Sequence, residues 1–174
     1  MKVMNQDHST VRRLQDKFGA QHFAVEEFAG MVTVTAPKSI LREVMQYLYD
    51  DPECAYAQLT DVIGIDYQGY PKHSPRFAIV YPLLGHQHNQ RLFIKILLEE
   101  PDLIVPSLAG IYASAEWAER EAAEMFGFVF EGHPDPRRLL LCDLFEGEHP
   151  LRKDYPLRGK GERERFEKIT RENA

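Results

Sequence analysis

The chain has few cysteines and no long apolar run. Its two cysteines, Cys54 and Cys142, lie far apart in a chain of 174 residues. An iron–sulfur cluster takes four such ligands, so this chain does not supply a cysteine-ligated cluster alone, and we expect two free thiols. No stretch approaches the roughly 20 apolar residues of a membrane helix, and residues 1–15 lack the apolar centre of a signal peptide. We therefore expect any membrane contact to come through a partner.

Compact motifs for chemistry are also missing. No GxGxxG follows a strand pattern, and neither GxxxxGK[ST] nor HExxH occurs. The set His133, Asp135, His149 and Asp154 contains residue types that bind zinc or transfer protons, so a stand-alone metal-dependent hydrolase is the alternative from another functional class. Both histidines, however, directly precede prolines on what should be extended chain. We expect no catalytic, cofactor-binding or metal-binding residue in this chain.

A second group of histidines lies between two strand patterns. His86 and His88 are separated by one residue, and His73 belongs to the preceding turn-rich segment. No carboxylates lie close by in the sequence, so an exposed hairpin loop explains the pair better than a metal site. We expect Asp61 and Asp66 to be surface or turn groups.

The charge is unevenly distributed. The net charge of −6 argues against a general nucleic-acid binder. Residues 137–174 nevertheless carry 10 of the 21 basic residues and 8 of the 27 acidic ones, so that a slightly basic tail follows an acidic body. This arrangement favours an acidic protein partner.

The periodicity of apolar residues predicts an α+β domain. Helical spacing occurs over residues 9–18 and 38–49, and strand patterns occur over 22–27, 31–35, 56–67, 76–84 and 91–98. Short turns between consecutive strands imply mainly antiparallel pairing, and residues 99–113 should form a loop. We expect a two-layer sandwich of a mainly antiparallel sheet with helices on one face, followed by an extended C-terminal arm.

The densest pattern is a short charged helix. Ser114 can cap it, and Gly127 follows it where a left-handed stop is expected. Its alanines and Met125 form one stripe of mostly small residues, while Arg120 lies four residues from both Glu116 and Glu124, a spacing at which opposite charges meet. From this pattern alone, a solvated face and a functional face remain equally open.

The segment that follows is basic and rich in proline. His133, Asp135, His149 and Tyr155 each precede a proline, which disfavours helix, so this segment should run extended over a surface. We therefore divide the chain into a core domain, residues 1–132, and a C-terminal arm, residues 133–174. The end of the arm, residues 159–174, is predicted to be either a polar helix on a partner or a mobile tail.

Three linked motifs carry a family resemblance. They are E-R-E-A-x-E-M-F-G from Glu119, F-E-G-H-P-D-x-R-R-L-L from Phe130, and E-G-x-H-P-L-R-K-D-Y-P from Glu146. Together they resemble the C subunit of the proton-translocating NADH:quinone oxidoreductase, respiratory complex I, whose eukaryotic relative is the 30-kDa subunit. Similar modules occur in membrane-bound hydrogenases and F420-linked complexes, so the equivalent small subunit of such a complex is the closer alternative.

The resemblance implies a non-catalytic scaffold subunit of the peripheral arm of that complex. Family members hold no cofactor, while FMN, the iron–sulfur clusters and the quinone site belong to partner subunits. The implied partners are the D subunit (49-kDa type), which helps to form the quinone site, and the cluster-bearing B and I subunits. The implied location is the cytoplasmic face of the bacterial inner membrane, reached indirectly through the complex. The chain, which ends soon after Pro156, resembles the unfused form of the subunit.

The resemblance also places the expected subunit contacts on the charged helix and the arm. The four basic residues of the arm are expected to pair with carboxylates of the helix or of a partner, while Leu139 to Leu141 and Tyr155 bury apolar area. For residues 119–121, internal salt bridges and partner contact are the two competing roles. The expected interface residues are Glu119, Arg120, Glu121, Arg137, Arg138, His149, Arg152, Lys153, Asp154 and Tyr155.

Overall fold

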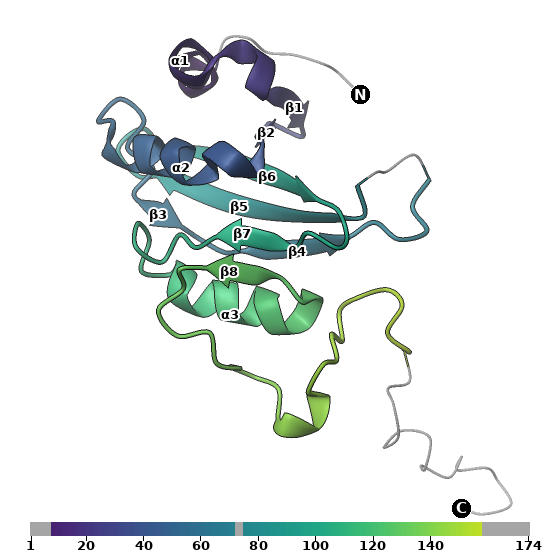
Figure 1. Ribbon diagram of the computed structural model, residues 1–174. Coiled ribbons are helices and arrows are strands. Elements are labelled where there is room, and N and C mark those ends of the chain that lie inside the picture. The colour runs from purple at the N-terminus through teal and green to yellow at the C-terminus, as the bar shows by residue number, and fades with distance from the viewer. Residues whose placement is uncertain (1–7, 72–74, 158–174) are drawn as a thin grey trace, which may run out of the picture.

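The computed structural model describes residues 8–71 and 75–157, which form an α+β fold. A six-stranded sheet has the order β1-β2-β6-β5-β3, and β4 also pairs with β5. All neighbours in this sheet are antiparallel except β2 and β6, which are parallel. The strands are β1 (Ala24–Phe28), β2 (Met31–Thr35), β3 (Gln58–Leu59), β4 (Ile63–Asp66), β5 (Phe77–Gly85) and β6 (Gln90–Leu98) (Figure 1).

The strand predicted over residues 56–67 is divided into β3 and β4. Leu59 pairs with Leu83, but Ile63 pairs with Val80, so three residues lie opposite two and the chain bulges. Pro82 occupies the facing position and has no N–H to donate to a ladder. The backbone N–H and the hydroxyl of Thr60 both donate to the Pro82 carbonyl instead.

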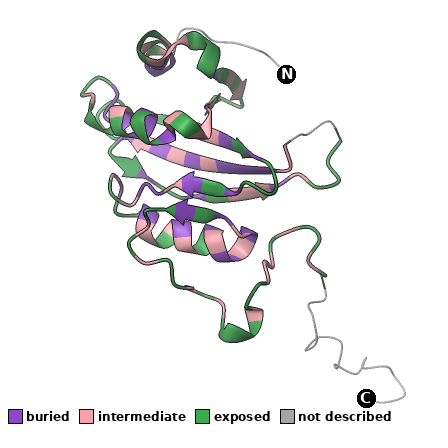
Figure 2. Ribbon diagram, in the orientation of Figure 1, coloured by how far each residue is buried: buried purple, intermediate pink, exposed green. Residues whose placement is uncertain are grey.

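One face of the sheet carries the core. Alternate residues of the two long strands are almost fully buried, among them Ile79, Tyr81, Ile94 and Ile96. Helix α2 (Leu41–Asp50), which follows the 3-10 turn Lys38–Ile40, contributes fully buried apolar side chains to the same core, and α1 (Ser9–Phe18) adds two more. Figure 2 shows the buried bands along these strands and along the helices. The helix predicted over residues 9–18 is confirmed.

Residues 99–113, predicted to be a loop, contain a strand. β7 (Ile104–Pro106) pairs in parallel with β8 (Val129–Glu131), and α3 (Ala115–Phe126) connects them. Parallel strands need such a crossover. The loop prediction failed because each strand has only three residues, which is too short to produce a recognisable alternation. The two strands are also separated in the sequence by α3, so their pairing is a tertiary contact that local pattern does not reveal.

Helix α3 begins after Ser114 and ends before Gly127, as predicted, but the Ser114 side chain does not cap it. Gly127 takes the left-handed conformation, with φ +81°. Ser114 is helical rather than extended, and its hydroxyl donates to the Leu59 carbonyl at 2.7 Å instead of capping the helix. Ala115 and Ala122 are buried, so the stripe of small residues packs against the core. The Phe126 ring at the end of α3 packs directly on Gly64 of β4, where a Cβ would lie 2.3 Å from the ring.

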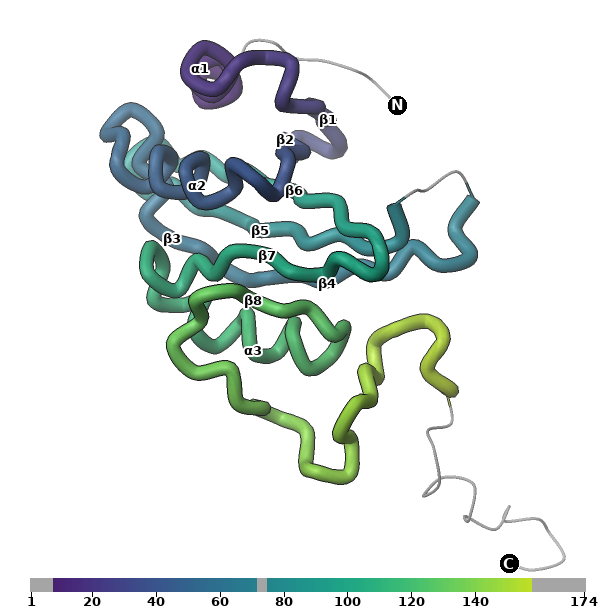
Figure 3. The backbone as a smooth tube through the Cα atoms, in the orientation of Figure 1, coloured from purple at the N-terminus to yellow at the C-terminus, as the bar shows by residue number. Residues whose placement is uncertain are grey.

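The described part of the arm, residues 133–157, contains little regular structure. Its 3-10 turn Asp143–Phe145 is the one helical element in this stretch. The tube in Figure 3 shows the chain leaving β8, passing along α3 and turning back towards the sheet. Residues 158–174, on which the prediction of a polar helix or a mobile tail falls, lie outside the described residues.

Two simpler predictions concern cysteines and membrane spans. Both cysteines are free, with Cys54 buried and Cys142 exposed. In the described part of the chain, no helix is both long and apolar enough to span a lipid bilayer.

Candidate functional site

The site is built on α3, which carries a fully buried acidic residue. Glu119 accepts hydrogen bonds from the Ser107 hydroxyl at 2.6 Å and from the Leu108 N–H at 2.7 Å. Burial raises the pKa of Glu119, although both hydrogen bonds oppose the shift. The interpretation of this position as part of a solvated face is therefore wrong. Glu119 fastens the segment after β7 to α3.

His133 makes the first link between α3 and the arm. Its Nε2 lies 3.0 Å from the Glu116 carbonyl, which can only accept, and its Nδ1 lies 3.0 Å from the Asp135 N–H, which can only donate. These contacts assign the neutral tautomer with the proton on Nε2. Nε2 is also 3.9 Å from Glu119. The histidine therefore shapes the turn that starts the arm.

Arg120 holds the backbone of the arm. Its Nε and Nη2 donate to the carbonyls of Arg137 and Arg138, both at 2.7 Å, and its Nη1 lies 3.5 Å from Asp135. Within the described helix, the predicted four-residue pairs with Glu116 and Glu124 do not occur. A planar guanidinium presents its donors in a fixed fork, which suits two successive carbonyls as well as it suits a carboxylate.

Glu124 binds the next three residues of the arm. Its carboxylate accepts the backbone N–H groups of Leu139, Leu140 and Leu141 at 2.7 to 3.2 Å. The side chain is 8% exposed. Hydrogen bonds to an ionised acceptor are stronger than neutral ones. Because Arg120 and Glu124 both bind main-chain groups, they fix the path of residues 137–141 whatever side chains the arm carries.

The arm in turn completes the C-terminal end of α3. The last four carbonyls of a helix lack partners within it. Here the Glu124 carbonyl accepts from His149 Nδ1 at 3.0 Å, the Met125 carbonyl from the Leu151 N–H at 3.2 Å, and the Phe126 carbonyl from Arg152 Nε at 2.6 Å. A cation at this end is also favoured by the helix dipole.

Gly127 allows this close approach. A Cβ at this position would lie 2.5 Å from Arg152 Nη2 and 2.6 Å from His149 Nε2. We expect Gly127→Ala to destabilise the protein by about 2 kcal/mol or more, because the left-handed backbone and the overlap both oppose it. Gly132→Ala is the matched control, since Gly132 has the same φ of +81° but no atom within 4 Å of the position that a Cβ would take. It should cost only about 1 kcal/mol. If urea titrations showed the same loss of unfolding free energy for both variants, overlap with Arg152 and His149 would not be what requires glycine at position 127.

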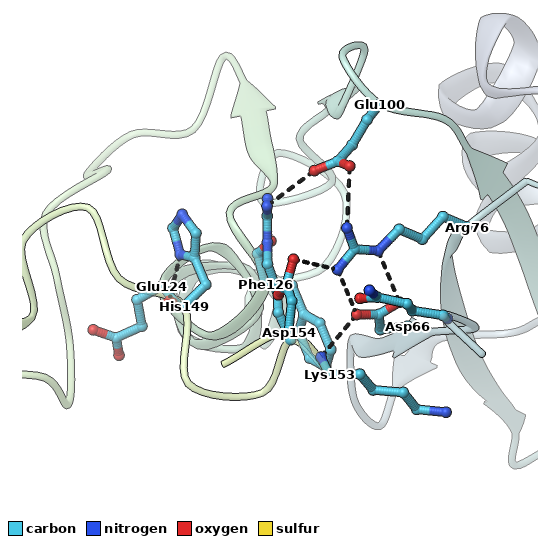
Figure 4. Close-up of polar contacts among 10 residues, drawn as sticks. Asp66, Arg76, Glu100, Glu124, Phe126, His149, Lys153 and Asp154 are labelled. Atoms are coloured by element: carbon cyan, nitrogen blue, oxygen red, sulfur yellow. Dashed lines mark hydrogen bonds and ion pairs between the residues drawn. The ribbon is translucent and has the colours of Figure 1, made fainter. Parts of the chain in front are cut away.

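An ionic cluster, formed by Asp66, Arg76, Glu100, Arg152 and Asp154, joins the arm to the sheet (Figure 4). Arg76 donates to both carboxylate oxygens of Asp66 at 2.9 and 3.1 Å, and it also reaches Glu100 and Asp154. Arg152 donates to the other oxygen of Glu100 at 3.0 Å. The cluster therefore connects the end of β4, the residue before β5, the segment after β6 and the end of the described arm.

Asp66 is the centre of this cluster. It is 5% exposed and accepts two further hydrogen bonds, from the backbone N–H groups of Gln68 and Lys153, both at 2.9 Å. Burial alone would raise the pKa of Asp66, but the hydrogen bonds from Arg76 and the two amides outweigh it and lower the pKa to about 2. The prediction that Asp66 is a surface or turn group is wrong, since it anchors the arm.

The predicted interface residues fall into two groups. Glu119, Arg120 and His149 are engaged within the chain, whereas Glu121 is exposed. Of the four arginine and lysine residues in the described part of the arm, residues 133–157, none pairs with a carboxylate of α3. Arg137 pairs with Asp135 and is mostly exposed, and Arg138 donates to the Cys142 carbonyl. Arg152 binds Glu100 and the Phe126 carbonyl. Lys153 donates its backbone N–H to Asp66, while its side chain points away (Figure 4).

The remaining predicted residues complete this division. Asp154 belongs to the ionic cluster, and Tyr155 is partly buried. Sequence reasoning missed Asp66, Arg76, Glu100 and Glu124. Arg76 is the first residue of one predicted strand, and Glu100 lies two residues after another. The short apolar run of Leu139 to Leu141 opposite an acidic helix gave no signal that its backbone would be bound.

His86 and His88 lie in the exposed hairpin loop between β5 and β6, as predicted. His86 Nε2 lies 2.7 Å from the Gln58 side-chain oxygen, and His88 Nε2 lies 3.2 Å from the Pro52 carbonyl. His73 lies outside the described residues. Over residues 8–71 and 75–157, no group of three or more histidine, cysteine, aspartate or glutamate side chains is arranged to hold a metal ion.

The fold and the site thus define an α+β module whose C-terminal segment is fastened to its last helix. Residues 34–161 match the family described as the 30-kDa subunit of the respiratory-chain NADH dehydrogenase. The C subunits of the NADH-quinone oxidoreductases of Brucella ovis and Brucella abortus are each 46% identical over 130 residues, which cover 75% of this chain. The chain spans 62% of the length of these relatives.

Two solved structures share the fold. The trypsin-resistant fragment (1–134) of Nqo5 is 31% identical, with a TM-score of 0.63, and the match covers 72% of this chain and 98% of the fragment. A chain of the membrane-bound sulfane sulfur reductase, an archaeal respiratory membrane complex, has a TM-score of 0.69 at 22% identity, over 84% of both chains. The latter likeness concerns the fold alone. The chain belongs to the family of the 30-kDa, or C, subunit of NADH-quinone oxidoreductase, complex I.

Proposed function

We propose that this protein is a non-catalytic scaffold subunit of the peripheral arm of complex I. The complex passes electrons from NADH through iron–sulfur clusters to quinone and couples this to proton translocation. In this proposal the chain holds no cofactor, and FMN, the clusters and quinone are bound by other subunits. Family membership and 46% identity to subunits of NADH-quinone oxidoreductases support NADH as the electron donor, ahead of the hydrogenase-like and F420-linked alternatives.

The proposed division of labour follows the two parts of the chain. Residues 1–132 form the two-layer body, and residues 133–174 form the arm that docks on partners. The observation that carries this proposal is how the arm is held. Because Arg120 and Glu124 bind its backbone, the arm keeps large apolar side chains on the surface: Leu140 is 60% exposed, Leu144 85% and Leu151 55%. Such exposed apolar groups on a fixed path are typical of a docking surface.

A shallow cavity adds a polar feature to the same surface. It measures about 190 Å³ and lies between α3 and the arm, with Arg120, Glu124, Arg138 and His149 among its lining residues. We propose that the D subunit covers this surface and that the B and I subunits lie near it, as the family resemblance implies. The complex would then hold the chain at the cytoplasmic face of the inner membrane. Electron transfer depends on distances that supporting residues maintain, so a rigid scaffold contributes without touching an electron.

The test is purification of the native membrane complex through a tag on this chain. We expect a flavin- and cluster-bearing assembly with NADH:quinone activity to be recovered. Leu144→Asp should lower the recovery of the other subunits at least about tenfold, because a charge would be buried without a partner. Leu144→Met, which keeps an apolar side chain, should preserve recovery. A lone soluble protein carrying stoichiometric metal would refute the proposal.

A further inference from the structure

The sheet has a second face that differs from the core face. The side chains of residues that pair across neighbouring strands lie on the same side of the sheet, so the strand register shows which residues belong to this second face. We call this side the open face. On β4, β5 and β6 its apolar residues are partly exposed, except for the fully buried Ala78, and Ile63 at 40% and Leu97 at 39% are the most exposed of them. The other apolar members on these strands are Ile65, Ala78, Val80, Pro82, Leu84 and Phe93.

The described helices and the β7–β8 pair all pack on the opposite side. Tyr112 donates to the Tyr56 carbonyl there, and Phe128 stacks edge-on against Phe77 of the core face. The apolar residues on the core face of β6, Leu92, Ile94, Ile96 and Leu98, are 2% exposed or less, whereas the alternate residues Phe93, Lys95 and Leu97 are intermediate or exposed. A sheet with an apolar face gains stability when a further layer covers that face.

Lys95 lies in the middle of this apolar surface, whereas Arg91, the other cation that the register places on this face of β6, is exposed opposite Leu84 near the start of the strand. Lys95 has Thr35 as its partner on one side and Val80 on the other. Its ammonium lies 5.2 Å from the centroid of the Tyr67 ring, and among residues 8–71 and 75–157 it has no ion-pair partner. The acidic residue placed on this face by the register, Glu26, belongs to the edge strand β1.

The charge of Lys95 determines what can cover this face. A wholly apolar partner would bury the ammonium without compensation, which is costly. An apolar surface with a carboxylate near its centre would instead satisfy Lys95 and gain the burial of the surrounding side chains. We propose that the open face is a second docking surface, which receives a helix of a partner protein whose apolar side carries an aspartate or glutamate that pairs with Lys95.

This inference rests on the proposed function, because it requires the chain to work inside an assembly. It adds a surface distinct from the docking surface on the arm, since the arm is fastened to α3 and α3 packs on the core face. A chain with docking surfaces on both sides of its sheet would bridge two neighbours. Each surface can be disrupted separately.

The test places a photo-crosslinking amino acid, benzoylphenylalanine, at Leu97 of the tagged chain in its native host. After irradiation of the purified complex, mass spectrometry should identify a crosslink to another subunit, in an apolar segment containing a carboxylate. Lys95→Glu and Lys95→Leu should each lower the recovery of that subunit roughly 30-fold, the scale expected when one partner of a buried charge pair is lost. Lys95→Arg should preserve recovery. Reversing the partner's carboxylate to lysine should rescue Lys95→Glu.

Two controls isolate the surface from the fold. Arg42→Glu reverses an exposed cation of α2 and should leave recovery unchanged. The isolated Lys95 variants should melt within a few degrees of the parent. A crosslink to a second copy of this chain, the absence of any protein crosslink, or full recovery with Lys95→Leu would overturn this inference. Failure of the unaltered chain to bring down any complex would instead overturn the proposed function.

Discussion

Replacing Asp66 by asparagine is expected to destabilise the protein by about 3 kcal/mol and to release the end of the arm. The substitution preserves shape but removes the charge that Arg76 and the Lys153 N–H both bind. Breaking a buried pair costs much because the remaining charge is stranded. Asp61→Asn is the matched control, since Asp61 is an exposed aspartate in the same segment. Urea unfolding should separate the two variants, and hydrogen exchange should increase at the Lys153 amide in Asp66→Asn alone.

The same residue predicts a pH dependence. The pKa of Asp66 is lowered from 3.8 to about 2 in the folded protein, so ionised Asp66 contributes about 2 kcal/mol of stability above pH 4. This contribution is lost as the pH falls from about 4 to about 2. The stability difference between the parent protein and Asp66→Asn should therefore shrink below pH 4, and a constant difference down to about pH 2 would contradict this account.

Replacing Glu124 by alanine is the second change with a large expected effect. Three backbone N–H groups would lose an ionised acceptor, and each such hydrogen bond contributes on the order of 1.5 kcal/mol or more. We expect residues 137–141 to separate from α3, so that their amides exchange at least about tenfold faster and trypsin cleaves sooner after Arg137 and Arg138. The body should keep its fold, because Glu124 binds the arm rather than the sheet.

Glu121→Ala provides the control for this experiment. Glu121 lies on the same helix, less than one turn away, and is exposed. It should leave both exchange and cleavage unchanged. If Glu124→Ala also left them unchanged, the arm would be held by its own side chains instead of by its backbone.

Much of the body could be predicted from local pattern. Helix α1 lies where the spacing of Val11, Leu14 and Phe18 places it, and Gly127 ends α3 with the expected left-handed conformation. These features depend on periodicity and backbone freedom, which are properties of neighbouring residues. The bulge between β3 and β4 depends on Pro82, a residue of another strand, and was missed for that reason.

The candidate site divides along the same line. Sequence motifs drew attention to the α3 segment and the arm, and the structure brings several of their charged residues together. Their contacts within the chain differ from those expected, and their contacts with a partner stay a prediction. Arg120 and Glu124 were expected to bind opposite charges on α3, but both bind main-chain groups of the arm, and the carboxylate near Arg120 is that of Asp135 in the arm. Every residue offers a backbone N–H or C=O, except that proline lacks the N–H, so such a contact leaves no trace in residue type.

The sequence by itself thus determined the family, the α+β class, the helix-ending glycine and the segment that carries the family motifs, because each is written in consecutive residues. Only the tertiary structure decided that Asp66 and Arg76 anchor the arm, that Glu119 is buried and that Lys95 lies within an open apolar face. These properties arise when strands and loops distant in sequence meet, for example Asp66 and Lys153, and burial and charge pairing depend on that meeting rather than on the residues alone.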